Sequence, residues 1–145
     1  MAERAEAQWV HIRVVNSLSF DTLSVRNTWL GWGKFHIENN KSVEIPVSDI
    51  NALRAPPGGS FNVFACGRAH SPSGTEGSFD VYNGDVRVAY IYWDCPWGSK
   101  RNQFRAEKIA DDYWVETGYW NQSGGAIGSV TVEIGRRDRA IRSSL

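Results

Sequence analysis

The stretch Gln8–Asn16, with the sequence QWVHIRVVN, alternates between apolar and mostly polar side chains. Three aliphatic residues fall on one face of an extended chain: Val10, Ile12 and Val14. Trp9 falls on the opposite face with His11 and Arg13. Period-2 alternation is typical of a β-strand that buries one face. We therefore expect a strand whose aliphatic face lies in the core and whose Trp9 points outward, where an exposed tryptophan needs a reason.

Similar patterns recur along the rest of the chain. They predict further strands at 23–29, 42–47, 60–65, 78–82, 86–93, 113–119 and 129–134. Breakers such as Pro56–Gly59 and the hairpin signal Asn83-Gly84 lie between them, and 48–54 is expected to form one short helical turn. A series of short strands separated by turns predicts an all-β sandwich or barrel. Because no linker or repeat interrupts the series, we expect a single domain.

The composition excludes several classes of protein. The chain has 145 residues, 41% of them apolar, and a net charge of zero. That length suits one domain, and a chain so apolar is not intrinsically disordered. No apolar run approaches the roughly 20 residues that span a bilayer, and Met1–Gln8 lacks the apolar core of a secretory signal peptide. Because general nucleic-acid binders are usually strongly basic, we expect no nucleic-acid partner.

The sequence offers no catalytic or metal-binding motif. HExxH, GxSxG and the P-loop are absent, and the carboxylate pair Asp111-Asp112 fits a solvated turn. Cys66 and Cys95 match no zinc spacing. They can form one disulfide or remain two buried thiols, and the lack of a signal peptide favours thiols. We therefore expect a protein that is not an enzyme and that needs no metal or cofactor.

Aromatic residues are densest at Tyr90–Lys100, YIYWDCPWGSK, in a chain with seven tryptophans. This segment combines aromatic faces with Asp94 and Lys100. A phospholipid headgroup needs such groups, because phosphate binds cations while an ammonium group binds aromatic faces and carboxylates. Trp97 lies between a proline and a glycine and is expected to project from a turn. Three other tryptophans are expected to be core residues: Trp29, Trp93 and Trp114.

The segment 93–100, WDCPWGSK, resembles the signature of the aegerolysin family. Other segments resemble family segments in the same order along the chain: Ala7–Val10, Trp32–Lys34, Cys66–Arg68, Gly74–Asp80 and Gly124–Val130. The resemblance covers about residues 7–136 and is greatest to the haemolysins of moulds. It suggests a flexible N-terminus at 1–6, an aegerolysin-like domain at 7–136 and a charged C-terminal tail at 137–145.

The resemblance implies a fold and a function. Aegerolysins are small antiparallel β-sandwich proteins, similar in shape to actinoporins, that are not enzymes. They bind sphingomyelin in cholesterol-rich membranes or ceramide phosphoethanolamine, and many form pores with a larger protein that has a perforin domain. The expected partners are therefore membrane sphingolipids and a perforin-like protein, with the chain monomeric in solution and assembling on membranes. The expected location is the cytoplasm, or the outside of the cell by a route that needs no signal peptide, with peripheral binding to target membranes.

The resemblance also implies which residues of this chain bind the lipid. The residues with a predicted lipid-binding role are Trp9, Trp32, Ser73, Glu76, Trp97, Lys100 and Arg101. We expect the three tryptophans to form one apolar rim, and Lys100 with Arg101 to meet the phosphate. Ser73 is a departure, because some family members carry an acidic residue there that can pair with an ammonium group. Glu76 lies three residues further on, so the sequence leaves open which sphingolipid is preferred.

Two other functions compete with lipid binding. A lectin-like module could bind sugars through Trp120, Asn121 and Gln122, because tryptophan platforms beside amides also bind carbohydrate. A protein-interaction module could use the basic segment Arg136–Arg142, which could instead meet anionic lipids. Lysis by the chain alone is not expected, because neither an amphipathic helix nor a long amphipathic hairpin is evident.

Overall fold

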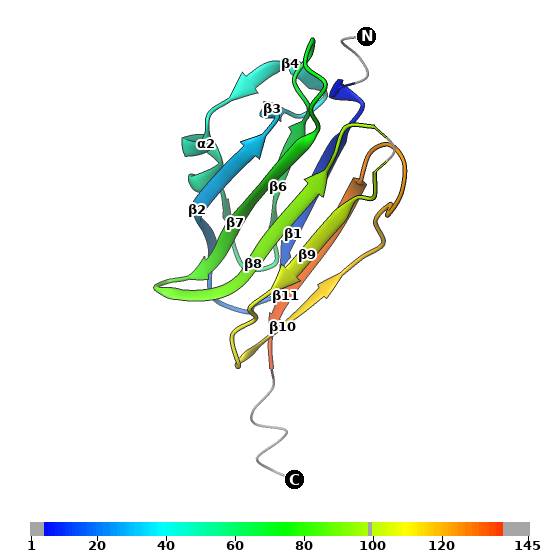
Figure 1. Cartoon of the computed structure of the whole chain (residues 1–145). Coiled ribbons are helices and arrows are strands. Elements are labelled where there is room, and N and C mark those ends of the chain that lie inside the picture. The colour runs from blue at the N-terminus through cyan, green and yellow to red at the C-terminus, as the bar shows by residue number, and fades with distance from the viewer. Residues whose placement is uncertain (1–4, 99, 138–145) are drawn as a thin grey trace.

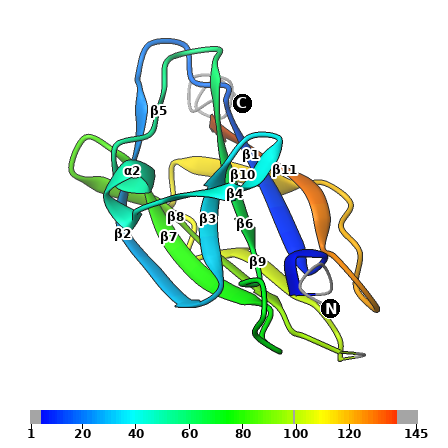
Figure 2. The same ribbon diagram turned by 90° about the horizontal axis from the view of Figure 1, so that it is seen from above.

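The computed structural model describes residues 5–98 and 100–137, and these form two β-sheets packed face to face. One sheet has six strands in the order β10-β11-β1-β6-β3-β4, and the other has five in the order β5-β2-β7-β8-β9. In Figure 1 the strands β7 and β8 lie in front of β6 and β1, and Figure 2 shows the two layers from above. The predicted β-sandwich is therefore confirmed.

The elements have the following bounds: β1 Trp9–Asn16, β2 Leu23–Trp32, β3 Lys34–Ile37, β4 Asn40–Ile45, α2 Val47–Asn51, β5 Arg54–Ala55, β6 Ser60–Cys66, β7 Thr75–Asn83, β8 Val86–Cys95, β9 Gln103–Glu107, β10 Tyr113–Thr117 and β11 Gly128–Arg136. The predicted short helical turn corresponds to α2. Strands β3, β5 and β9 were not predicted from the sequence. Among the described residues, no helix has the length and apolar character needed to cross a bilayer.

The core lies between the two sheets. Val10, Ile12 and Val14 of β1 are buried there, as their alternation predicted. Trp93 of β8 is completely buried, with its ring 6.0 Å from that of Phe35. Cys66 and Cys95 are buried free thiols, and burial raises the pKa of each to about 11.

The centre of the six-stranded sheet corrects the expectation of a purely antiparallel fold. Strands β1 and β11 pair in parallel, with Val10 opposite Gly128 and Asn16 opposite Ile134. Their other neighbours, β6 and β10, are both antiparallel. Hairpin signals predict only how consecutive strands pair. The first and last strands are joined by nearly the whole domain, so either direction was open to them.

Two irregularities in β2 decide where its tryptophans point. The pairing with β7 shifts register between Arg26 and Trp29, and again between Leu30 and Trp32. Each extra residue reverses the alternation, because side chains alternate with a period of two. Trp29 is therefore 48% exposed, and the prediction that it is a core residue is wrong. Trp32 is turned to the same outer face and is 62% exposed. The core prediction is confirmed for Trp93, while Trp114 is half-buried.

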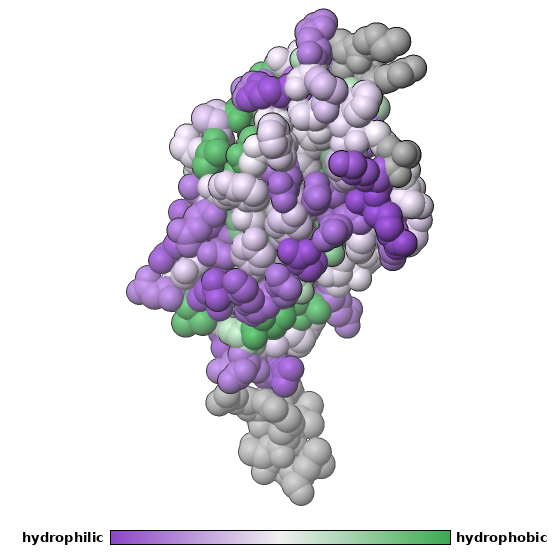
Figure 3. Space-filling model, in the orientation of Figure 1, coloured by the Kyte–Doolittle hydropathy of each residue, from purple (hydrophilic) through white to green (hydrophobic). Residues whose placement is uncertain are grey.

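The outer face of the five-stranded sheet is mostly polar, as Figure 3 shows. Three cations lie over tyrosine rings on its strands or at their ends, at 4.3–4.9 Å from the centroids: Arg26 over Tyr82, Arg105 over Tyr92 and Lys108 over Tyr90. The side chains of Arg26 and Arg105 are about half-exposed to solvent. Most of this face is therefore a solvated surface, and its exposed tryptophans are exceptions.

Ordered residues lie just outside both expected ends of the domain. Ala5 is buried, and Glu6 forms an ion pair of 2.8 Å with Lys34, so these two residues, expected in a flexible N-terminus, are packed. At the other end, the backbone N–H of Arg137 donates to the carbonyl of Asp112 at 2.9 Å. The rest of the predicted tail, from residue 138, lies outside the described residues, as do residues 1–4.

Candidate functional site

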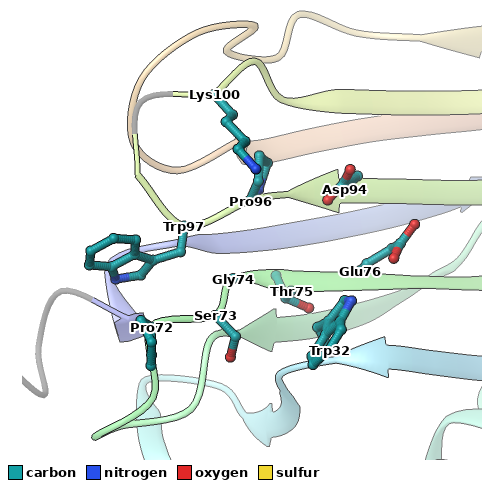
Figure 4. A pocket seen from close by; sticks show the side chains of 10 residues that line it. All are labelled: Trp32, Pro72, Ser73, Gly74, Thr75, Glu76, Asp94, Pro96, Trp97 and Lys100. Atoms are coloured by element: carbon teal, nitrogen blue, oxygen red, sulfur yellow. The ribbon is translucent and has the colours of Figure 1, made fainter.

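A hollow of about 320 Å³ opens where β2 ends, β7 begins and β8 ends. Figure 4 shows the side chains that line it. These are Trp32, Pro72, Ser73, Gly74, Thr75, Glu76, Asp94, Pro96, Trp97 and Lys100. The sheet supplies Trp32, Glu76 and Asp94, and the loops before β7 and after β8 supply most of the others. We call this set of residues the end hollow.

The loop before β7 approaches the end of β8 very closely at Gly74. A Cβ atom at this position would lie 1.8 Å from the carbonyl oxygen of Cys95. Real Cβ atoms do not come so close, so any larger residue would push the two segments apart. Gly74 therefore lets the loop that carries Ser73 pack against the loop that carries Trp97, and this contact closes one side of the end hollow.

Two carboxylates lie side by side on the strands of the end hollow. In the register of the sheet, Glu76 of β7 is opposite both Trp32 of β2 and Asp94 of β8. The Tyr92 hydroxyl donates a hydrogen bond to Glu76 Oε2. Burial and the nearby charge of Glu76 raise the pKa of Asp94, and Lys100 opposes this shift. The two acids therefore concentrate negative charge that favours a cationic group.

Aromatic and basic groups complete the end hollow. Trp97 extends outward from its loop, while Glu76 and Asp94 lie further in on the strands (Figure 4). Trp97 is 41% exposed, so its ring is available to a ligand. Lys100 supplies a cation at the same opening. The end hollow thus offers carboxylates and aromatic faces for an ammonium group and a lysine for a phosphate group.

The structure brings together five of the seven residues predicted from the sequence: Trp32, Ser73, Glu76, Trp97 and Lys100. The prediction of one rim made by three tryptophans is wrong, because Trp9 lines a different hollow, on the six-stranded sheet. There the Lys41 ammonium lies 5.6 Å from the centroid of its ring. Arg101 is not among the residues of the end hollow and forms a β-bridge with Ser123. Asp94 was missing from the predicted set, although its alternation with buried Trp93 already placed it on the outer face.

The structure gives little support to the segments that were considered for sugar binding and for protein interaction. The Asn121 amide donates to the carbonyls of Gly124 at 2.7 Å and Ala126 at 2.9 Å, so it holds its own loop. Trp120 is partly buried and packs on Phe104, with ring centroids 6.2 Å apart. In the basic segment, Arg136 forms an ion pair of 3.0 Å with Asp21. Residues 138–142 of that segment lie outside the described residues.

The profile of the family described as Aegerolysin matches residues 7–137, nearly the whole of the described chain. The chain belongs to the aegerolysin family. A search of characterised proteins finds Asp-hemolysin of Aspergillus fumigatus, 49% identical over 92% of this chain and 96% of the relative. Aegerolysin Aa-Pri1 of Cyclocybe aegerita is 37% identical over 93% of this chain and 94% of the relative. The crystal structure of RahU protein in complex with a Tris molecule superposes with a TM-score of 0.87 at 36% identity, covering 92% and 98% of the two chains.

Membership of the aegerolysin family fixes the broad function. The aegerolysins are haemolysins and lipid-binding proteins, not enzymes. The family and fold predicted from the sequence are therefore confirmed, including the similarity to a mould haemolysin. Whether the residues of the end hollow bind the lipid remains a prediction.

Proposed function

We propose that this aegerolysin recognises the zwitterionic phospho-headgroup of a membrane sphingolipid in the end hollow. The observation that carries the proposal is the placement of two carboxylates, two exposed tryptophans and one lysine around one opening. Glu76 and Asp94 would receive the ammonium group, and Lys100 would receive the phosphate. Trp32 and Trp97 would lie at the depth of the headgroups, where tryptophan is enriched at membrane interfaces.

The carboxylates favour ethanolamine over choline. A primary ammonium has three N–H donors that carboxylate oxygens can accept, whereas a quaternary ammonium has none and relies on aromatic faces. Ser73 carries no charge and cannot form an ion pair with a cation, but Glu76 and Asp94 supply two acids at the same opening. The Tyr92 hydroxyl holds one of them in place. Of the two sphingolipids expected from the sequence, ceramide phosphoethanolamine is therefore the one we propose.

Vesicle sedimentation tests the headgroup. We expect the protein to pellet at least tenfold better with ceramide phosphoethanolamine and cholesterol than with sphingomyelin and cholesterol, and not with phosphatidylcholine alone. A charge-assisted hydrogen bond contributes about 1.5–3 kcal/mol, which corresponds to a factor of ten or more. The buffer must contain no primary amine, because a RahU structure was solved with a Tris molecule. The variant Glu76→Gln should lose the selectivity, and Glu116→Gln, exposed on β10, is its control. Equal pelleting with all three vesicle types contradicts the proposal.

We also propose that the chain supplies the lipid-targeting component of a two-component pore. This rests on its 49% identity to a protein named as a haemolysin and on the resemblance to aegerolysins that act with perforin-like proteins. In a dye-release assay on ceramide phosphoethanolamine vesicles, the chain alone should release little dye. Addition of a perforin-like partner from a fungal aegerolysin pair should increase release at least tenfold. Full release by the chain alone would contradict the two-component proposal and leave the headgroup proposal intact.

A further inference from the structure

Tyr92 contacts the end hollow from outside it. This residue lies on the outer face of β8, two positions before Asp94, and does not line the hollow. Its hydroxyl donates a hydrogen bond to Glu76 Oε2 on the neighbouring strand β7. Burial, together with this bond, raises the pKa of Tyr92, so the hydroxyl stays protonated and able to donate. One oxygen of the Glu76 carboxylate is therefore held by a residue outside the hollow.

The ring of Tyr92 is itself held from the opposite side. Arg105 lies opposite Tyr92 on β9, and its guanidinium carbon is 4.3 Å from the centroid of the ring. Arg105 also bonds to two side chains of its own strand, Gln103 at 3.0 Å and Glu107 at 3.4 Å. A cation over an aromatic face is attracted to the ring and stabilises this arrangement. The phenol is thus fixed between β9 and the Glu76 carboxylate.

The second oxygen of Glu76 is left for a ligand. Glu76 lines the end hollow, and none of the hydrogen bonds found among the described residues involves its Oε1. An ionised carboxylate has about four acceptor positions on its two oxygens. Because Tyr92 fixes Oε2, the direction in which Oε1 can accept a hydrogen bond is fixed as well.

A carboxylate of fixed orientation matters for one headgroup more than for the other. The N–H groups of a primary ammonium need an acceptor along the direction of each bond, because hydrogen bonds weaken steeply at poor angles. A quaternary ammonium has no N–H group and is attracted by charge and by aromatic faces, which depend little on the direction of one oxygen. The orientation of Glu76 should therefore change the binding of ethanolamine and leave the binding of choline nearly unaltered.

We infer that Tyr92 is a positioning residue that sets the preference of the end hollow for a primary ammonium. The inference rests on the proposed function and adds that the selectivity depends on a hydroxyl outside the hollow as well as on the acids inside it. With Oε2 held by Tyr92, Glu76 Oε1 meets one N–H of the ethanolamine group. Asp94, opposite Glu76 in the sheet, meets a second.

The variant Tyr92→Phe tests the inference, because it removes the hydroxyl and keeps the ring beside Arg105. Binding is measured by sedimentation with vesicles of ceramide phosphoethanolamine and cholesterol and with vesicles of sphingomyelin and cholesterol. We expect the first affinity to fall about three- to tenfold, the effect of one hydrogen bond, and the second to stay within about twofold. A merely structural role would weaken both affinities alike. An unchanged ratio of the two affinities would overturn the inference.

Tyr90→Phe is the matched control. Tyr90 lies on the same outer face of β8 with the Lys108 ammonium 4.9 Å from the centroid of its ring. Its hydroxyl takes part in none of the hydrogen bonds found in the described part of the chain, so its loss should leave the ratio of affinities unchanged. An equal change of the ratio in both tyrosine variants would overturn the inference.

A double variant shows whether Tyr92 acts through Glu76. Tyr92→Phe combined with Glu76→Gln should have the same ratio of affinities as Glu76→Gln alone, because residues that act on one interaction are not additive. A further loss of selectivity in the double variant would overturn the inference.

The same assay separates this inference from the proposed function. If the unmodified protein prefers ceramide phosphoethanolamine and Tyr92→Phe keeps the full preference, only the role of Tyr92 is wrong. If the unmodified protein binds both vesicle types equally, the proposed function fails and the role of Tyr92 fails with it.

Discussion

Replacing Trp97 with alanine is expected to weaken binding to ceramide phosphoethanolamine vesicles by about 10- to 100-fold. An aromatic face contributes about 0.5–2 kcal/mol to holding a cation, and its insertion at the membrane interface adds to this. Each 1.4 kcal/mol corresponds to a factor of ten in affinity. Trp97 is 41% exposed and projects from a loop, so its removal leaves the core intact. The Tm should therefore change by no more than about 2–4 °C, the shift that 1 kcal/mol produces in a domain of this size.

The matched control for Trp97 is Trp29→Ala. Trp29 is an exposed tryptophan on the five-stranded sheet, at 48%, and it does not line the end hollow. Its loss should leave vesicle binding within about threefold of the unmodified protein, because less than 1 kcal/mol of membrane contact is involved. A large fall in the Tm of Trp97→Ala would show that Trp97 stabilises the fold, and equal losses of binding in both variants would contradict the assigned site.

Replacing Trp93 with alanine is expected to reduce the free energy of unfolding by about 3–5 kcal/mol. Trp93 is completely buried between the sheets, where its ring contacts those of Phe35 and Phe79 at 6.0 and 6.2 Å. Its Nε1–H also donates to Thr75 Oγ1 at 3.1 Å. The resulting cavity lies directly beneath the strands that carry Glu76 and Asp94. Denaturant unfolding followed by circular dichroism measures the loss.

The conservative variant Trp93→Phe separates the two contributions of this residue. It keeps an aromatic ring in the core but removes the N–H donor, leaving the Thr75 hydroxyl without that partner. We expect a smaller loss than for alanine, about 1–3 kcal/mol, from the unpaired hydroxyl and the reduced volume. A loss below about 1 kcal/mol for Trp93→Ala would mean that the two sheets do not pack on this ring.

The sequence predicted the fold where local patterns decide it. The alternation in β1 correctly separated buried Val10 and Ile12 from the outward-facing Trp9. The same logic failed for Trp29, because the register shifts in β2 come from its pairing with β7. The parallel pairing of β1 with β11 also could not be predicted from the sequence, because it joins distant segments and no turn sets its direction.

In the candidate site, too, local sequence predicted some contacts, and contacts between distant strands could not be predicted. Trp97 and Lys100 are close in sequence, so the signature segment was enough to place them together. Trp32 joins them only because the second irregularity of β2 turns it outward beside Glu76. Asp94 was noted in the aromatic segment but not included among the binding residues, because its pairing with Glu76 on the neighbouring strand could not be read from the sequence. Trp9 was assigned to the wrong group because alternation predicts the face of a sheet and not which hollow a side chain lines.

The parallel pairing of β1 and β11 has a consequence for biosynthesis. Of the described strands, β1 emerges first from the ribosome and β11, one of its two neighbours in the sheet, emerges last. His11 and Ser129, which hydrogen-bond across this pair, are 118 positions apart in the chain. Until β11 is released, β1 exposes an unpaired edge that can pair with other nascent chains. The six-stranded sheet is therefore expected to form completely only after β11 has been made.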